Sequence, residues 1–66
     1  MNYSAQIKAL RMKMLLTQRE FAVLLGVSFE TVNRWENGKY EPTMRIKRQL
    51  SELFKKYQIF ITEETL

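Results

Sequence analysis

Apolar residues recur every three or four positions through residues 1–57, a spacing that puts them on one face of an α-helix. Ile7, Leu10 and Met14 follow this spacing and predict a first helix over residues 4–15. The chain contains one proline, two glycines and no internal repeat, so the signals that start and stop helices are easy to separate. The pattern predicts an all-α fold.

The second predicted helix has the clearest start signal in the chain. Thr17 and Glu20 have the spacing of a capping box, in which the threonine hydroxyl accepts from the glutamate amide and the glutamate carboxylate accepts from the threonine amide. Leu16 and Phe21 are expected to pack together across this start. Gly26 is expected to end the helix in the left-handed conformation that glycine adopts at little cost.

A third helix is predicted directly after this stop. Ser28 is a suitable N-cap residue, and Gly38 suits a helix that ends at Asn37. With about 100° of rotation per residue, the inner side of the helix is formed by Ser28, Val32, Trp35 and Glu36. The outer side is formed by Glu30, Asn33, Arg34 and Asn37, with Phe29 and Thr31 at its margins.

The last helix is predicted to follow Pro42 and Thr43 and to run for up to about four turns, as one helix or as two that break near Ser51. The tail after it leaves the helical pattern, and its β-prone start allows a strand, a packed tail or a continuation of the helix. We therefore divide the chain into a domain of residues 1–57 and a tail of residues 58–66. The expected core is Met14, Leu15, Phe21, Leu24, Leu25, Val32, Trp35, Ile46 and Leu50.

The composition excludes several kinds of site. The chain has no cysteine and no histidine, and its seven acidic residues are all glutamate. Disulfides, thiolate or imidazole metal sites and histidine-based catalysis are therefore excluded. With 66 residues the chain has room for one domain. We expect no catalytic residue, no metal and no cofactor, and we do not expect an enzyme.

The charge of the chain favours a polyanionic partner. Eleven Lys and Arg residues against seven Glu residues give a net charge of +4, and most of the basic excess lies in residues 39–57. A basic domain suits the backbone of a nucleic acid. No apolar run approaches the roughly 20 residues of a membrane-spanning helix, and the start of the chain lacks the apolar segment of a signal peptide. We expect a soluble, cytoplasmic protein that does not bind a membrane.

One segment, residues 18–37, carries a specific spacing of residues. Ala22, Gly26 and Val32 stand fifth, ninth and fifteenth in it. A small residue at the first of these positions lets two helices approach, glycine at the second makes the turn, and an aliphatic residue at the third fills the space beneath. Together with the ending Trp35–Lys39, this spacing resembles the helix-turn-helix of the lambda-repressor-like family, the Cro/Xre-type regulators. The resemblance implies a compact domain of four or five helices.

The resemblance also implies roles for particular side chains, because the third helix of the family enters the major groove of DNA. The residues expected to contact bases are Phe29, Glu30, Thr31, Asn33 and Arg34. The residues expected to contact phosphates are Gln18, Asn37, Lys39, Tyr40, Thr43 and Arg45. Arg11 and Glu36 match an ion pair that joins the first and third helices in the family, and we expect them to be structural. Packing of Phe29 and an ion pair between Arg34 and Glu30 are the alternatives to base contact.

These implied contacts predict sequence-specific binding of a double-stranded DNA operator by a small transcriptional repressor or autoregulator that forms a homodimer on DNA. One alternative is an antitoxin whose tail, residues 58–66, binds a toxin as its protein partner. Another is a protein-interaction module that has lost DNA binding. For the tail, packing on its own core, strand exchange between two copies and a helical interface between two copies all remain open.

Overall fold

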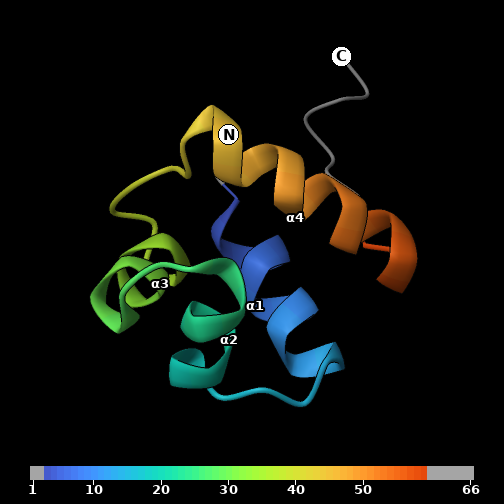
Figure 1. Cartoon of the computed structure of the whole chain (residues 1–66), viewed down its shortest axis with the longest axis horizontal. Helices are drawn as coiled ribbons and strands as arrows, with labels where there is room; N and C mark the ends of the chain where they lie inside the picture. Colours follow the sequence, from blue (N-terminus) through green and yellow to red (C-terminus); the bar gives the residue numbers. More distant parts are fainter. Residues whose placement is uncertain (1–2, 60–66) are drawn as a thin grey trace.

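Four helices make up most of residues 3–59, the part of the chain that the computed structural model describes. They are α1 (Ser4–Lys13), α2 (Gln18–Leu25), α3 (Phe29–Glu36) and α4 (Met44–Tyr57). In Figure 1, α1 lies in the middle of the molecule, α2 and α3 lie on one side of it, and α4 lies across the other. The contacts agree with this view, because α1 packs on α3 and on α4, and α2 packs on α3. The predicted all-α fold is confirmed.

Three of the helices begin at a residue whose side chain caps the first turn. The Thr17 hydroxyl accepts from the Glu20 amide at 3.1 Å, and the Glu20 carboxylate accepts from the Thr17 amide at 2.9 Å. Ser28 caps α3, and Thr43 caps α4. The predicted capping box is therefore confirmed, and α4 is one continuous helix with no break near Ser51.

All four helices end in the same backbone arrangement. A residue with positive φ stands just beyond each helix: Leu15 (60°), Gly26 (73°), Gly38 (75°) and Gln58 (60°). The next N–H along the chain then donates to the carbonyl oxygen five residues earlier, which is the Schellman motif. Gly26 and Gly38 were predicted to stop helices. Because Leu15 is not a glycine, nothing in the sequence marks the first stop, and α1 ends at Lys13 instead of at the predicted Leu15.

The hydrophobic core lies where the four helices meet, and every helix contributes to it. Its buried residues are Ile7, Leu10, Phe21, Ala22, Leu25, Val32, Trp35, Ile46, Leu50 and Phe54. Ala22 is the small residue between α2 and α3, and it is 3% exposed. The absence of a larger side chain at this position lets the two short helices pack closely, which holds each of them in a helical conformation that it would not keep alone.

Two residues of the expected core are on the surface, and a third is half-buried. Leu15 is 89% exposed because it lies in the left-handed turn beyond α1. Leu24 is 50% exposed because it lies about 100° round α2 from the centre of its buried face. Met14 packs against the edge of the core. The expectation that Leu15 and Leu24 belong to the core is therefore wrong.

The tail can be followed only at its start. Ile59 packs against the core beyond the end of α4. Residues 60–66 lie outside the described residues, and the predictions of strand exchange, helical pairing and partner binding by the tail fall on them. Within residues 3–59, no helix has the length and apolar character needed to cross a membrane.

Candidate nucleic-acid interface

The two sides of α3 differ as the helical pattern predicts. Val32 and Trp35 are buried in the core, whereas Glu30, Arg34 and Asn37 are exposed on the opposite side. The remaining candidate base-contacting residues, which are half-buried at the margins, are Phe29, Thr31 and Asn33. One expected position is wrong, because Ser28 is exposed: it precedes the helix as its cap and does not follow the helical angle.

A tight turn between α2 and α3 sets the position of the exposed side of α3. Gly26 has φ 73°, and the N–H of Val27 donates to the Ala22 carbonyl at 2.9 Å. Val27 is half-buried against the core, and Ser28 starts the next helix at once. With so few residues between the helices, α3 has little freedom to move relative to α2.

An ion pair between Arg11 and Glu36 joins α1 to the last turn of α3. The guanidinium Nε lies 2.7 Å from Glu36 Oε2, and Nη2 lies 3.0 Å from Oε1. Nη1 donates to the Leu16 carbonyl at 3.0 Å. The two side chains are 15% and 5% exposed. The hydrogen bond to Glu36, helped by the carboxylate's charge and opposed by burial, raises the pKa of Arg11 above its ordinary value, so the guanidinium stays charged.

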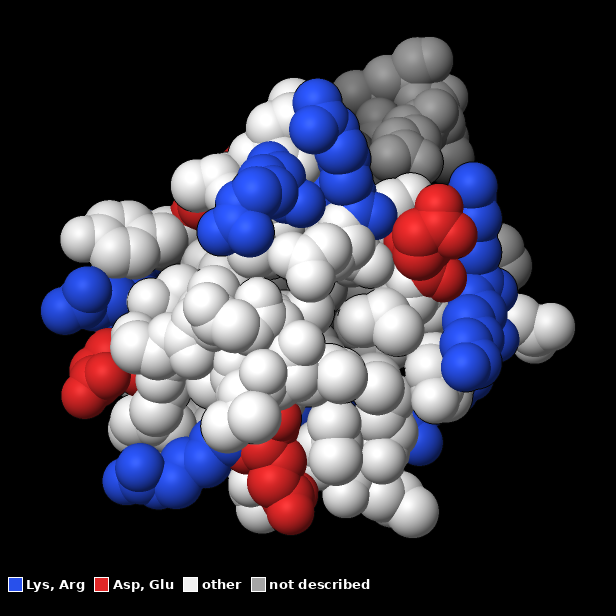
Figure 2. Space-filling model, in the orientation of Figure 1, with Lys and Arg blue, Asp and Glu red and all other residues white. Residues whose placement is uncertain are grey.

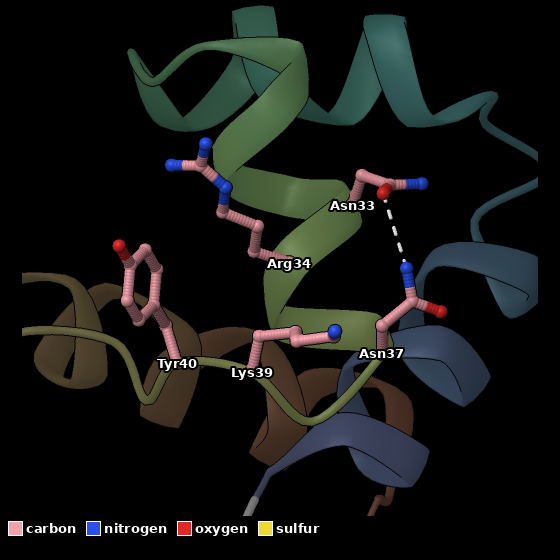
Figure 3. Close-up of a pocket in the computed structure, with 5 residues that line it drawn as sticks. All are labelled: Asn33, Arg34, Asn37, Lys39 and Tyr40. Atoms are coloured by element: carbon pink, nitrogen blue, oxygen red, sulfur yellow. Dashed lines mark hydrogen bonds between the residues drawn. The ribbon is translucent and has the colours of Figure 1, made fainter.

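The same carboxylate anchors a chain of side-chain amides that crosses the outer surface of α2 and α3. Gln18 Nε2 donates to Glu36 Oε1 at 3.0 Å, and Asn33 Nδ2 donates to Gln18 Oε1 at 3.3 Å. Asn37 Nδ2 donates to Asn33 Oδ1 at 3.1 Å (Figure 3). An ionised carboxylate only accepts hydrogen bonds, so it determines which end of each amide faces which neighbour. Three residues expected singly at the site thus form one hydrogen-bonded unit.

The end of α3 and the segment after it line a hollow of about 540 Å³ that is open to solvent. Its lining residues are Asn33, Arg34, Asn37, Lys39 and Tyr40 (Figure 3). The guanidinium carbon of Arg34 lies 5.4 Å from the centre of the Tyr40 ring. Among the described residues, the side-chain partner of Arg34 is this ring and not Glu30, so the alternative ion pair is not formed. Two cations and two amides around one hollow suit a negatively charged, hydrogen-bonding surface.

A second contact between an arginine and an aromatic ring lies at the other end of α3. The guanidinium carbon of Arg19, in the first turn of α2, is 4.6 Å from the centre of the Phe29 ring. Phe29 is half-buried at the margin of the outer surface. Its ring therefore contacts Arg19 on one side and remains partly accessible on the other. Arg19 was not among the predicted site residues. Its charge is visible in the sequence, but its distance from Phe29 depends on how α2 and α3 cross.

Three of the expected phosphate-contacting residues do not line the hollow. Gln18 belongs to the chain of amides described above, and the other two are on α4 or at its start. The Thr43 hydroxyl accepts from the Ile46 amide at 3.5 Å as the cap of α4, and Arg45 is exposed in the first turn of that helix. Neither residue lines the hollow. In Figure 2, basic and acidic side chains are spread round the edge of the face in view, and the centre of that face carries no charge. The excess of basic residues is therefore not gathered into one patch on this face.

Comparisons with known proteins agree with this geometry. A helix-turn-helix family model matches residues 7–57, which span α2, α3 and the hollow. A protein of Archaeoglobus fulgidus named as an uncharacterized HTH-type transcriptional regulator is 38% identical over 61 residues, 89% of this chain and 86% of the relative. A protein of Methanocaldococcus jannaschii with the same kind of name is 39% identical over 51 residues, 74% of this chain and 77% of the relative. No solved structure shows significant similarity.

Proposed function

The chain belongs to the Cro/C1-type helix-turn-helix family, and we propose that it is a sequence-specific, double-stranded DNA-binding protein that acts as a small transcriptional repressor or autoregulator. The observation that carries the proposal is the exposed side of α3, where Arg34 stands beside amides that are linked to a buried ion pair. The names of the archaeal relatives support the regulatory part of the proposal. Repression would follow from occupation of an operator.

In the proposed complex, α3 lies in the major groove. Its eight residues span about 12 Å, similar to the width of the groove, at about 1.5 Å per residue. Arg34 would donate two hydrogen bonds to O6 and N7 of a guanine, a contact typically worth about 1–3 kcal/mol of discrimination. Glu30 would accept from a cytosine amino group, and Phe29 would contact a thymine methyl group. Thr31 and Asn33 complete the proposed base-contacting set.

The proposed phosphate contacts flank this helix. The carboxamide of Gln18 is held by Glu36 and Asn33, so its backbone N–H, at the first position of α2, is the donor that suits a phosphate. The other proposed contacts come from the region after the buried part of α3: Asn37, Lys39, Tyr40, Thr43 and Arg45. Contacts of this kind position a protein on DNA without reading its sequence.

A single recognition helix reads only about 4–6 base pairs, which is too few to specify one site in a genome. We therefore propose a homodimer on DNA, with two copies on half-sites about one helical turn apart. In this proposal, residues 1–57 form the DNA-binding domain and residues 58–66 form a tail available for dimerisation or for a protein partner.

Selection from a randomised pool of double-stranded DNA at about 150 mM salt tests the proposal. The wild type is compared with Arg34→Ala and with a control, Arg48→Ala, which removes an exposed arginine of α4. We expect a palindromic sequence with a guanine preference that Arg34→Ala loses and Arg48→Ala keeps. Binding without any sequence preference, or no binding at all, would contradict the proposal.

A further inference from the structure

Tyr40 lies between α3 and α4, and its ring contacts Arg34. The distance of 5.4 Å from the guanidinium carbon to the ring centre is within the range of about 6 Å over which a cation is attracted to an aromatic face (Figure 3). The side chain is 57% exposed, so it is not part of the core. Packing in the core therefore does not account for an aromatic residue at this position.

Two features of the backbone hold Tyr40 beside Arg34. The N–H of Lys39 donates to the carbonyl oxygen of Arg34 at 2.9 Å, so the residue just before Tyr40 is bonded to the backbone of Arg34 itself. Pro42, a short distance after Tyr40, is buried. The segment that carries the ring is thus attached at both ends. The fold, and not only the meeting of two long side chains, places the ring next to the guanidinium group.

The contact with the ring leaves the hydrogen-bonding groups of Arg34 available. Within residues 3–59, the Arg34 side chain makes no hydrogen bond and no ion pair, although Glu30 lies one turn earlier on α3. An ion pair with Glu30 would engage the same N–H groups that guanine requires. An aromatic face attracts the positive charge without accepting those N–H groups in hydrogen bonds.

We propose that Tyr40 is a positioning residue for base recognition: its ring holds the Arg34 side chain where its N–H groups reach guanine, and the ring itself contacts no base. This inference rests on the proposed function, because it requires Arg34 to read DNA. In this proposal the ring of Tyr40 positions Arg34, whereas the hydroxyl group of Tyr40 is the part that would contact a phosphate. Tyr40 then contributes to specificity as well as to affinity.

Two substitutions separate the ring from the hydroxyl group. Tyr40→Phe keeps the ring and removes the hydroxyl, and Tyr40→Leu removes both. For each variant, the affinity is measured for the operator selected by the wild type and for the same operator with the preferred guanine replaced. We expect Tyr40→Leu to lower the ratio of the two affinities by about two- to fivefold, the effect of one exposed cation–π contact. Tyr40→Phe is expected to leave the ratio unchanged.

Two further variants serve as controls. Lys39→Ala removes the other cation of the hollow and is expected to weaken binding to both sequences equally. In an Arg34→Ala background, Tyr40→Leu is expected to leave the ratio unchanged, because the side chain that the ring positions is then absent. Two results would overturn the inference. In the first, Tyr40→Phe and Tyr40→Leu lower the ratio of the two affinities equally. In the second, Tyr40→Leu lowers the affinity for both sequences by the same factor.

A measurement on the free protein tests the contact without DNA. In the NMR spectrum, the Arg34 side-chain protons are expected to shift in Tyr40→Leu, where the ring is lost, and to stay nearly unchanged in Tyr40→Phe. Unchanged Arg34 shifts in Tyr40→Leu would overturn the inference and leave the proposed function standing. A wild type that binds DNA with no base preference would overturn both.

Discussion

Replacing Arg11 by methionine removes the positive partner of the ion pair between α1 and α3 and keeps most of the unbranched apolar stem of the side chain. Glu36 then loses guanidinium donors at 2.7 and 3.0 Å and keeps the Gln18 amide at 3.0 Å. Because the Glu36 side chain is only 5% exposed, water that enters the space left by the guanidinium group replaces the lost donors only in part. The substitution therefore leaves a nearly buried negative charge without a counter-charge.

The expected loss is large for a chain of this size. Removing one partner of a buried ion pair typically costs about 3–5 kcal/mol, and the 15% exposure of Arg11 places this pair near the lower value. A domain of 66 residues has a total stability of about 3–10 kcal/mol, at about 0.05–0.15 kcal/mol per residue. The double variant Arg11→Met, Glu36→Gln replaces the stranded charge by an amide that still accepts from Gln18. We expect it to recover about half of the loss.

Urea unfolding at low temperature measures these differences. The fluorescence of Trp35 reports the transition, because it is the single tryptophan of the chain and is 3% exposed. Glu41→Gln is the control: it breaks the exposed ion pair with Lys47 and is expected to cost less than about 1 kcal/mol. The reasoning would be refuted if Arg11→Met lowered the free energy of unfolding by less than about 1 kcal/mol. It would also be refuted if the loss in the double variant equalled the sum of the losses in the two single variants.

The helix ends provide further predictions, all measured by the same urea unfolding. Leu15→Gly is expected to stabilise the protein by about 0.5–1 kcal/mol, because a left-handed φ costs leucine about 1–2 kcal/mol and its exposed side chain loses little packing; a lower stability would show that the side chain packs on something. Gly26→Ala is expected to cost about 1–2 kcal/mol through the backbone alone, since nothing lies within 4 Å of the added Cβ; an unchanged midpoint would contradict this. Thr17→Ala removes the capping hydroxyl and is expected to cost about 1 kcal/mol, and no change would show that the capping box contributes nothing.

Much of the fold was predictable because its signals are local. The cap of α2, the cap of α3 and the glycine turn between them depend on residues at most five positions apart. The errors arose where no local signal exists. The apolar spacing around Leu15 continues past the end of α1, which is marked by a positive φ at a residue that is not a glycine. Leu24 is apolar like its neighbours, and only the packing of α2 shows that it faces outward.

The sequence predicted which candidate residues lie on the outer side of α3, but it predicted few of their contacts. The outer side of α3 follows from helical geometry, and the pairing of Arg11 with Glu36 was expected from the family resemblance. The chain of amides through Gln18 and Asn33 was not expected, because each of these side chains has several possible partners in the sequence. An ion pair of Arg34 with Glu30, one turn away on the same helix, was the alternative to base contact, and in the structure Arg34 lies against Tyr40 instead.

By itself, the sequence determined approximately where the helices lie, the caps of α2 and α3 and the two glycine turns, because hydrogen bonds between near neighbours and the special backbone freedom of glycine decide these features. Only the tertiary structure decided how close polar side chains from different helices come to one another. Arg11 and Glu36 are 25 residues apart, and Gln18 and Glu36 are 18 apart. Their distances depend on how three helices pack, and that packing is set by the shared core and not by any one segment.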